Sequence, residues 1–252
     1  MELFISDVSK SFGGVQALED VTFRVQPGSI HSIIGPNGAG KTTLLNCISG
    51  QYKPEGSIRY GNAELTGIRA HERIHLGIAR TFQHINVFPE QTVLENLMVG
   101  GHHRLKRGLF SQCLYWSSFG CRDEEAGLFE EALGILEKLG MTDEAEVPAG
   151  ELSYGKQKHL ELGRALMARP KLLLLDEPMA GMTQAEKKEL SRWIMEINGE
   201  GITILMIEHD MSVVQSVSSH TVVLDFGRKI AEGTPKEVVK DERVRKAYLG
   251  EA

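Results

Sequence analysis

The segment that decides the fold of this chain runs Gly35-Pro36-Asn37-Gly38-Ala39-Gly40-Lys41-Thr42. The apolar run Ser29–Ile34 before it predicts a short buried strand, and Thr42–Ser49 after it predicts a helix. Glycine lets the backbone turn with positive φ and approach a ligand closely, and the N-terminus of the following helix attracts an anion. The spacing therefore predicts a loop that wraps a polyphosphate in backbone N–H groups. The alternative is an ordinary glycine-rich turn between a strand and a helix.

Within this loop the side chains have separate expected roles. Lys41 is expected to reach the β- and γ-phosphates, and Thr42 is expected to ligate Mg²⁺. The predicted polyphosphate site comprises the whole loop and the residue after it: Gly35, Pro36, Asn37, Gly38, Ala39, Gly40, Lys41, Thr42 and Thr43.

A second motif places two acids at the end of an apolar run. Leu172–Leu175 reads as a buried strand, and Asp176, Glu177 and Pro178 follow it directly. Open α/β sheets bind ligands at the carboxyl ends of their strands. Asp176 is therefore expected to hold Mg²⁺ through water, and Glu177 to polarise an attacking water. The alternative is a solvated strand end or an acid pair at a helix N-terminus.

Composition sets the broad class of protein. The 252 residues include 28 Lys and Arg against 34 Asp and Glu, a net charge of −6, which argues against binding nucleic acid through bulk charge. No apolar run approaches the roughly 18 residues that cross a bilayer, and Met1–Phe4 has no basic leader. We therefore expect a cytosolic protein, with Cys47, Cys113 and Cys121 reduced.

The order of predicted elements indicates an α/β fold. Residues 1–35 show short alternating apolar patterns typical of strands, and residues from about 85 to 165 show helical periods. After residue 170 strands and helices alternate: Lys171–Leu175, Gln184–Ile197, Ile202–Glu208, Ser212–Val217 and His220–Leu224. Fully apolar strands that alternate with helices predict a mostly parallel sheet covered on both faces.

Taken together, the motifs resemble those of the ABC-type ATPases. Leu152-Ser153-Tyr154-Gly155-Lys156-Gln157 is similar to the signature LSGGQ of that family. Gln83 lies where the family has its Q-loop glutamine, His209 where it has a switch histidine, and Phe12 where it has an aromatic ring against adenine. The resemblance covers nearly the whole chain, in the expected order.

The resemblance implies a P-loop NTPase fold of the ABC type. It implies a mostly parallel core, an N-terminal antiparallel β subdomain, and one ATP-binding domain over 1–252 with a helical subdomain inserted at about 85–165. ATP and Mg²⁺ are the implied cofactors. Glu177, His209 and Gln83 are the implied catalytic residues, with Gln83 also a metal ligand beside Thr42 and Asp176. The implied nucleotide contacts beyond the loop are Phe12, Ser153, Tyr154, Gly155 and Lys156.

Two positions depart from the family pattern. The signature has Tyr154 for its first glycine and Lys156 for its glutamine, although Ser153 and Gly155 remain. Thr183 stands where many relatives have Asp, in a loop that forms hydrogen bonds between protomers in the family.

The resemblance also implies partners. Two chains, identical or paralogous, would close head to tail with ATP between Lys41 of one and Ser153 of the other. Transmembrane permease subunits would dock a coupling helix near residues 84–100, a stretch that ordinary core packing also explains. A substrate-binding protein would take part indirectly, and the chain would sit on the inner face of the membrane. The segment 102–123 fits either a membrane-surface role or a solvated excursion.

Among transporters, the chain most resembles the ATPases of branched-chain (hydrophobic) amino acid importers. Shared stretches are Arg80–His84, Glu95–Leu97, the aromatic signature and Tyr248–Ala252. Urea importers and lipopolysaccharide exporters are the nearer alternatives. A soluble ABC ATPase of repair or translation would carry long heptad insertions or two cassettes. A small-molecule kinase would need an Arg-rich lid.

Overall fold

A computed structural model describes residues 1–83, 85–105 and 119–249. The contacts between residues divide the chain into two compact units. The first comprises residues 1–83 and 171–252, and the second comprises residues 84–170. The predicted helical insertion at about 85–165 falls within the second unit.

The first unit contains a six-stranded sheet in the order β10-β9-β3-β8-β7-β6. The five strands from β9 to β6 are parallel, and β10 joins the edge antiparallel to β9. This arrangement confirms the predicted mostly parallel sheet. The strands are β3 (Ile30–Ile34), β6 (Ile78–Arg80), β7 (Leu172–Asp176), β8 (Thr203–Ile207), β9 (His220–Asp225) and β10 (Arg228–Gly233).

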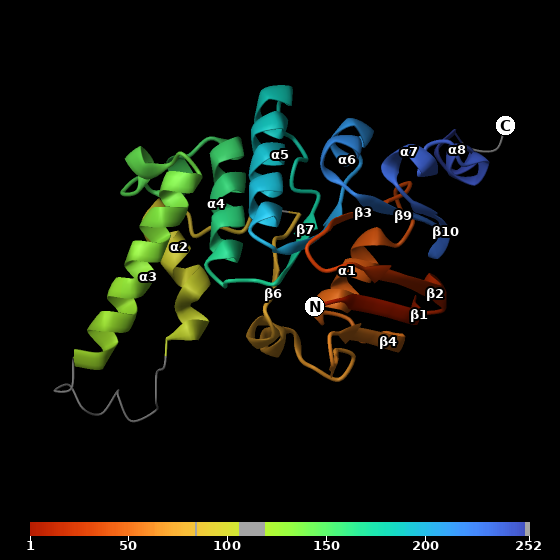
Figure 1. Cartoon of the computed structure of the whole chain (residues 1–252), viewed down its shortest axis with the longest axis horizontal. Coiled ribbons are helices and arrows are strands. Elements are labelled where there is room, and N and C mark those ends of the chain that lie inside the picture. The colour runs from red at the N-terminus through yellow and green to blue at the C-terminus, as the bar shows by residue number, and fades with distance from the viewer. Residues whose placement is uncertain (84, 106–118, 250–252) are drawn as a thin grey trace. The chain divides into compact units, whose positions relative to one another are not determined.

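Both faces of this sheet are covered, because its central strands are buried at every position. Alternate side chains, such as Ile33 and Leu174, join one core cluster with α1 (Lys41–Ser49). Ile34 and Val223 point to the opposite side, into a second cluster. On that opposite face lie α5 (Gln184–Gly199), α6 (Met211–Val217), α7 (Pro235–Val238) and α8 (Glu242–Leu249) (Figure 1).

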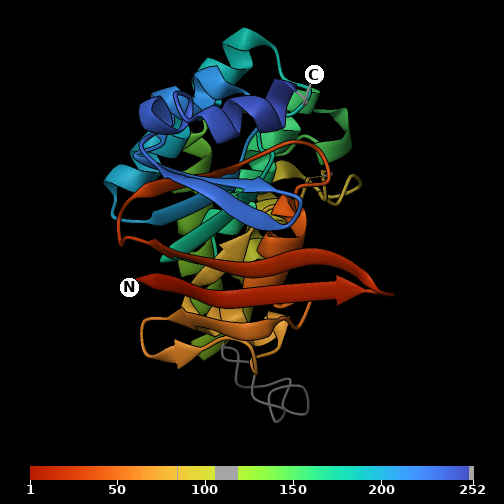
Figure 2. The ribbon, with the colours of Figure 1, turned by 90° about the vertical axis from the view of Figure 1, so that its right-hand side faces the viewer.

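A second, antiparallel sheet confirms the predicted N-terminal β subdomain. Its order is β2-β1-β4-β5, and Figure 2 shows its two long strands side by side. Helix α1 lies between this sheet and the parallel one, in a single core cluster with both. The strands are β1 (Leu3–Phe12), β2 (Val15–Val25), β4 (Glu55–Tyr60) and β5 (Ala63–Glu64), and the 3-10 helix η1 (Ala70–Leu76) follows.

The second unit is helical, as its sequence periods predict. Its helices are α2 (Val93–Gly101), α3 (Phe119–Lys138) and α4 (Tyr154–Leu166), with short 3-10 turns at His102–Arg104, Thr142–Glu144 and Ala149–Glu151. Leu128, Ala132 and Leu136 of α3 are buried, as their spacing predicts. A Cβ on Gly163 would lie 2.8 Å from Leu97 and Leu139, so this glycine lets the helices approach closely. Residues 106–118 of the segment 102–123 lie outside the described residues, as do His84 and residues 250–252.

The sequence did not predict strand β10 or the two helices after it. Only Ile230 and Ala231 in this strand are apolar, so no strand period is visible. The strand forms because Phe226 and Gly227 both have positive φ, 41° and 79°, and reverse the chain in a tight hairpin. Within the described residues, no helix combines the length and the apolar character that crossing a membrane requires.

Candidate active site

The glycine loop joins β3 to α1, and its geometry requires glycine at both ends. Gly35 and Gly40 have φ values of 150° and 97°. A Cβ on Gly35 would lie 2.1 Å from the carbonyl oxygen of Leu224 in β9, and one on Gly40 would lie 2.5 Å from that of Ala17 in β2. Because backbone cannot yield cheaply at such distances, side chains are excluded from both positions.

The loop ends at a helix N-terminus that is open to an anion. Gly40 is the N-cap of α1, and in the described structure no side chain caps this end and no acid occupies the first turn. The first N–H groups of a helix have no partner within the helix, and the helix dipole places positive charge there. Residues 41–43 therefore present the N–H groups that a phosphate can accept from.

Lys41 is folded into the loop. Its side chain is buried, and Nζ donates to the carbonyl oxygens of Gly35 (2.9 Å) and Pro36 (2.8 Å). Burial lowers the pKa of Lys41, while the nearby carboxylates of Glu177 and Asp176 oppose that shift. The structure thus brings the glycine loop and the acid pair together.

The two acids differ in their surroundings. Asp176, the last residue of β7, is 1% exposed, and its Oδ2 accepts from the guanidinium of Arg80 at 2.8 Å. Glu177 follows with a φ of 48°, and its N–H donates to Ile207 of β8 at 3.1 Å. A non-glycine residue with left-handed backbone is costly, and such strain is often found at functional sites.

All three predicted catalytic residues meet at the Glu177 carboxylate. Gln83 Nε2 donates to Oε2 at 3.1 Å, and His209 Nε2 lies 2.6 Å from Oε1. These residues follow three different strands, β6, β7 and β8, at the carboxyl edge of the parallel sheet. A carboxylate oriented by two polar side chains can accept a proton from a water molecule.

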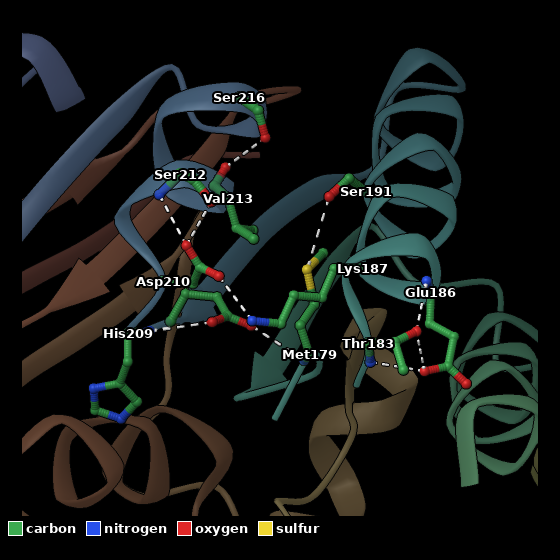
Figure 3. Close-up of polar contacts among 11 residues, drawn as sticks. Met179, Thr183, Glu186, Lys187, Ser191, His209, Asp210, Ser212, Val213 and Ser216 are labelled. Atoms are coloured by element: carbon green, nitrogen blue, oxygen red, sulfur yellow. Dashed lines mark hydrogen bonds and ion pairs between the residues drawn. The ribbon is translucent and has the colours of Figure 1, made fainter. Parts of the chain in front are cut away.

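The segment that carries His209 is held by acids on either side of it. Buried Glu208 accepts from the backbone N–H groups of Met179 and His209, both at 3.1 Å, and burial raises its pKa. Asp210 caps α6 by accepting from the Ser212 N–H at 3.0 Å and pairs with Lys187 of α5 at 2.7 Å. In Figure 3 the His209 ring points away from this network. The network therefore fixes the backbone, while the imidazole itself contacts Glu177.

Replacing Asp210 with Ala is expected to lower the free energy of unfolding by about 1 kcal/mol, the usual cost of losing a helix cap. The hydrogen bonds from Lys187 and Ser212 hold the pKa of Asp210 at about 2, below its value in the unfolded chain. That stabilisation is present above about pH 4 and is lost as the pH falls towards 2. Urea unfolding at pH 7 and pH 3 measures it, with the exposed Asp143→Ala as control. Equal losses in both variants, or a loss that does not shrink with acid, would contradict this role.

Phe12 lies at the end of β1 and is 41% exposed. The Tyr52 ring meets it edge-on, with centroids 5.0 Å apart, and Lys10 Nζ lies 5.2 Å from the Phe12 centroid. Phe12 is therefore an exposed but supported aromatic ring. Tyr52 was not predicted, because nothing in its local sequence distinguishes it.

The signature residues belong to the second unit. Ser153 is exposed and caps α4 by accepting from the Lys156 N–H at 3.4 Å. Tyr154 is exposed at the first position of the helix, Gly155 is buried, and the Lys156 ammonium pairs with Glu144. The serine hydroxyl and the start of the helix lie together at one helix N-terminus, which is the feature that favours an anion.

Thr183, the second departure from the family pattern, has a local role. It is the N-cap of α5 and forms a reciprocal capping box with Glu186: its N–H donates to Glu186 Oε2 at 2.8 Å, and its hydroxyl accepts from the Glu186 N–H (Figure 3). A threonine caps a helix nearly as well as an aspartate, so the start of α5 is maintained.

Three contacts around the site were missed by sequence reasoning. Arg80 binds Asp176, and Lys187 binds Asp210. In the third contact the Gly35 backbone hydrogen-bonds the hydroxyl of Tyr248 in α8. Burial raises the pKa of Tyr248, and this hydrogen bond opposes that rise. Each pair joins residues far apart in the chain. No local pattern identifies such partners, although Arg80 and Tyr248 lie in stretches that resemble those of the amino acid importer ATPases.

The donor atoms near the acid pair suit a hard divalent cation. The Thr42 hydroxyl, the Gln83 amide oxygen and the Asp176 carboxylate are all oxygen ligands, which Mg²⁺ prefers. Among the described residues, no group of three or more His, Cys, Asp or Glu side chains could hold a metal ion.

A family model described as ABC transporter matches residues 18–180. The chain belongs to this family. It is therefore an ATP-binding, ATP-hydrolysing subunit of the ABC transporter type. A second family model, described as branched-chain amino acid ATP-binding cassette transporter, matches residues 228–252, which contain β10, α7 and α8.

Similar proteins align with nearly the whole chain. The high-affinity branched-chain amino acid transport ATP-binding protein LivG of Escherichia coli K12 is 42% identical over 99% of this chain and 98% of its own. BraF of Pseudomonas aeruginosa, which has the same description, is 40% identical over the same shares. A crystal structure of a nucleotide-free ATP-binding cassette from an ABC transporter superimposes with a TM-score of 0.86, at 36% identity and 100% coverage of both chains. An ADP conformation of such a cassette also gives 0.86, at 37% identity over 100% of both chains.

Proposed function

We propose that this chain powers the import of branched-chain, hydrophobic amino acids by hydrolysing ATP on behalf of separate transmembrane permease subunits. Two observations support this substrate class: the names of the full-length relatives LivG and BraF, and the match of residues 228–252 to the branched-chain amino acid cassette family. The whole chain, 1–252, would work as one ATP-binding domain with its helical subdomain inserted.

In the proposed site, each group near the glycine loop has a defined task. Lys41 and the N-terminal N–H groups of α1 bind the β- and γ-phosphates, and Phe12 stacks on the adenine. Thr42, Gln83 and Asp176 would hold Mg²⁺, and the ion would neutralise charge on the phosphates. Glu177 accepts the proton of the attacking water, and His209 orients Glu177 and faces the γ-phosphate. Support comes from the hydrogen bonds of Gln83 and His209 to Glu177.

The proposed site is completed by a second protomer. Ser153, Tyr154, Gly155 and Lys156 of one chain would contact the γ-phosphate of ATP bound to the other, through the N-terminus of α4. The exposure of Ser153 and Tyr154 supports this role. The ring of donors around the phosphate then forms only on closure of the dimer, identical or paired with a paralogue, and hydrolysis reopens it.

Closure of the ATPase dimer would act on the transmembrane permease subunits. We place the chain in the cytoplasm, on the inner face of the membrane, where residues 84–100 receive a coupling helix of the permease. A substrate-binding protein would deliver the amino acid on the far side. The relatives' names support a transport complex, and the exposed Phe88 lies in the proposed docking segment.

The convergence of Gln83 and His209 on Glu177, beside the loop that holds Lys41, carries this proposal. We expect steady phosphate release from ATP with no phosphate acceptor present, because water is the proposed nucleophile. A colorimetric phosphate assay of the purified chain checks this. Release that depends on an added small acceptor would instead indicate a kinase.

The transported substrate is tested in proteoliposomes with the cognate permease and binding protein. Binding protein loaded with leucine, isoleucine or valine is expected to stimulate ATP hydrolysis several-fold, while urea is expected to have no effect. Stimulation by urea, or extraction of lipopolysaccharide, would replace the proposed substrate and leave the motor function standing.

A further inference from the structure

Arg80, the last residue of β6, binds two parts of the site at once. Its side chain is 8% exposed. One terminal nitrogen donates to Asp176 Oδ2 at 2.8 Å, and the other donates to Asn46 Oδ1 at 2.6 Å and Ser49 Oγ at 2.7 Å. A planar guanidinium holds its donors in a fixed fork, so these partners are fixed relative to one another.

The two groups held by this fork belong to the elements that carry the proposed metal ligands. Asp176 ends β7, and Asn46 lies four residues after Thr42 on α1. Residues four apart share one face of a helix. Arg80 therefore links the helix that carries the Thr42 hydroxyl to the strand that carries the Asp176 carboxylate.

The same residue also adjoins the third oxygen donor. Gln83 follows Arg80 by three residues, and the ring of Phe82, between them, lies 5.2 Å from the Arg80 guanidinium. The end of β6 thus supplies both the fork and the segment that leads to Gln83.

We propose that Arg80 is a positioning residue for the divalent cation, which orients the Asp176 carboxylate and sets its position relative to the Thr42 helix. Arg80 does not touch the nucleotide or the metal in this scheme. The inference rests on the proposed function, since it assumes that these residues bind Mg²⁺ with ATP. Residues that orient metal ligands commonly change metal affinity 10- to 100-fold when they are replaced.

The test measures metal binding directly. Mn²⁺ binding in the presence of a non-hydrolysable ATP analogue is followed by electron paramagnetic resonance for the wild type and Arg80→Lys. Lysine keeps the charge but cannot bridge Asp176 and Asn46 as a planar fork does. We expect Mn²⁺ affinity to fall about 10-fold in Arg80→Lys, with affinity for the analogue in EDTA unchanged.

Arg73→Lys is the matched control. Arg73 is also buried and also binds the end of α1, through the carbonyl oxygens of Cys47 and Ile48, but it is not a partner of Asp176 in the described structure. A general loosening of α1 would lower Mn²⁺ affinity in both variants. Asn46→Ala, which removes one anchor and keeps Arg80, is expected to weaken Mn²⁺ binding a few-fold and serves if Arg80→Lys does not fold.

Each outcome is decisive. A selective loss in Arg80→Lys and Asn46→Ala supports the positioning role. Unchanged Mn²⁺ affinity in these variants, or an equal loss in Arg73→Lys, overturns it. If the wild type itself shows no Mn²⁺ binding that depends on the nucleotide analogue, the proposed Mg²⁺–ATP site fails instead, and the two failures are thereby distinguished.

Discussion

Replacing Glu177 with Gln leaves ATP binding intact and slows hydrolysis by about 10²- to 10⁴-fold, the usual contribution of a general base. Glutamine keeps the size of the side chain and can still hydrogen-bond Gln83 and His209, which lie 3.1 Å and 2.6 Å from the carboxylate oxygens. It cannot accept the proton of the attacking water. The chain should therefore accumulate with ATP bound.

Two measurements check this expectation. Phosphate release gives the turnover number, and size-exclusion chromatography with ATP reports whether the variant stays dimeric. Glu189→Gln, at an exposed position of α5, is the control and should match the wild type. Turnover in Glu177→Gln at the wild-type rate would mean that another group activates the water.

Replacing Lys41 with Ala is expected to lower ATP affinity about 100-fold, or about 2.7 kcal/mol, in keeping with the loss of hydrogen bonds to a charged group. Lys41 is 5% exposed, and its Nζ is directed into the loop by two carbonyl oxygens, so the charge is already in place for the phosphates. Because burying that ammonium is itself costly, the variant should still fold.

Isothermal titration with ATP and with adenosine separates the phosphate contact from the base contact. Affinity for adenosine should be unchanged in Lys41→Ala, because the ring of Phe12 is unaffected. Lys188→Ala, at an exposed position of α5, controls for loss of a surface charge. Similar ATP affinity in Lys41→Ala and the wild type would remove the loop from the proposed site.

Local sequence patterns predicted the elements around the loop because each has a clear period or terminator. The apolar run before Gly35 and the four leucines before Asp176 form β3 and β7, with ends within one residue of expectation. Both acids and the loop then meet, since carboxyl ends of parallel strands share one edge of a sheet.

What could not be predicted depends on contacts between distant residues. The Arg80–Asp176 pair requires β6 to lie beside β7, and strand order is not encoded in a period of two. Likewise, β10 exists because a tight turn returns the chain to β9, and its own composition is too polar to indicate a strand. The meaning of Gln83 and His209 came from the family resemblance, because a lone Gln or His at a strand end is usually structural.

The backbone of two sheets packs closely against the glycine loop, and this has a mechanical consequence. Gly35 lies against the backbone of β9, and Gly40 lies against that of β2. The Gly227 N–H donates to the Ala39 carbonyl, and the Gly227 carbonyl accepts from the Glu19 N–H. These contacts leave the loop little room to shift when a triphosphate binds. We therefore expect the two sheets to move together when a nucleotide binds the loop, because backbone contacts join the loop to both of them.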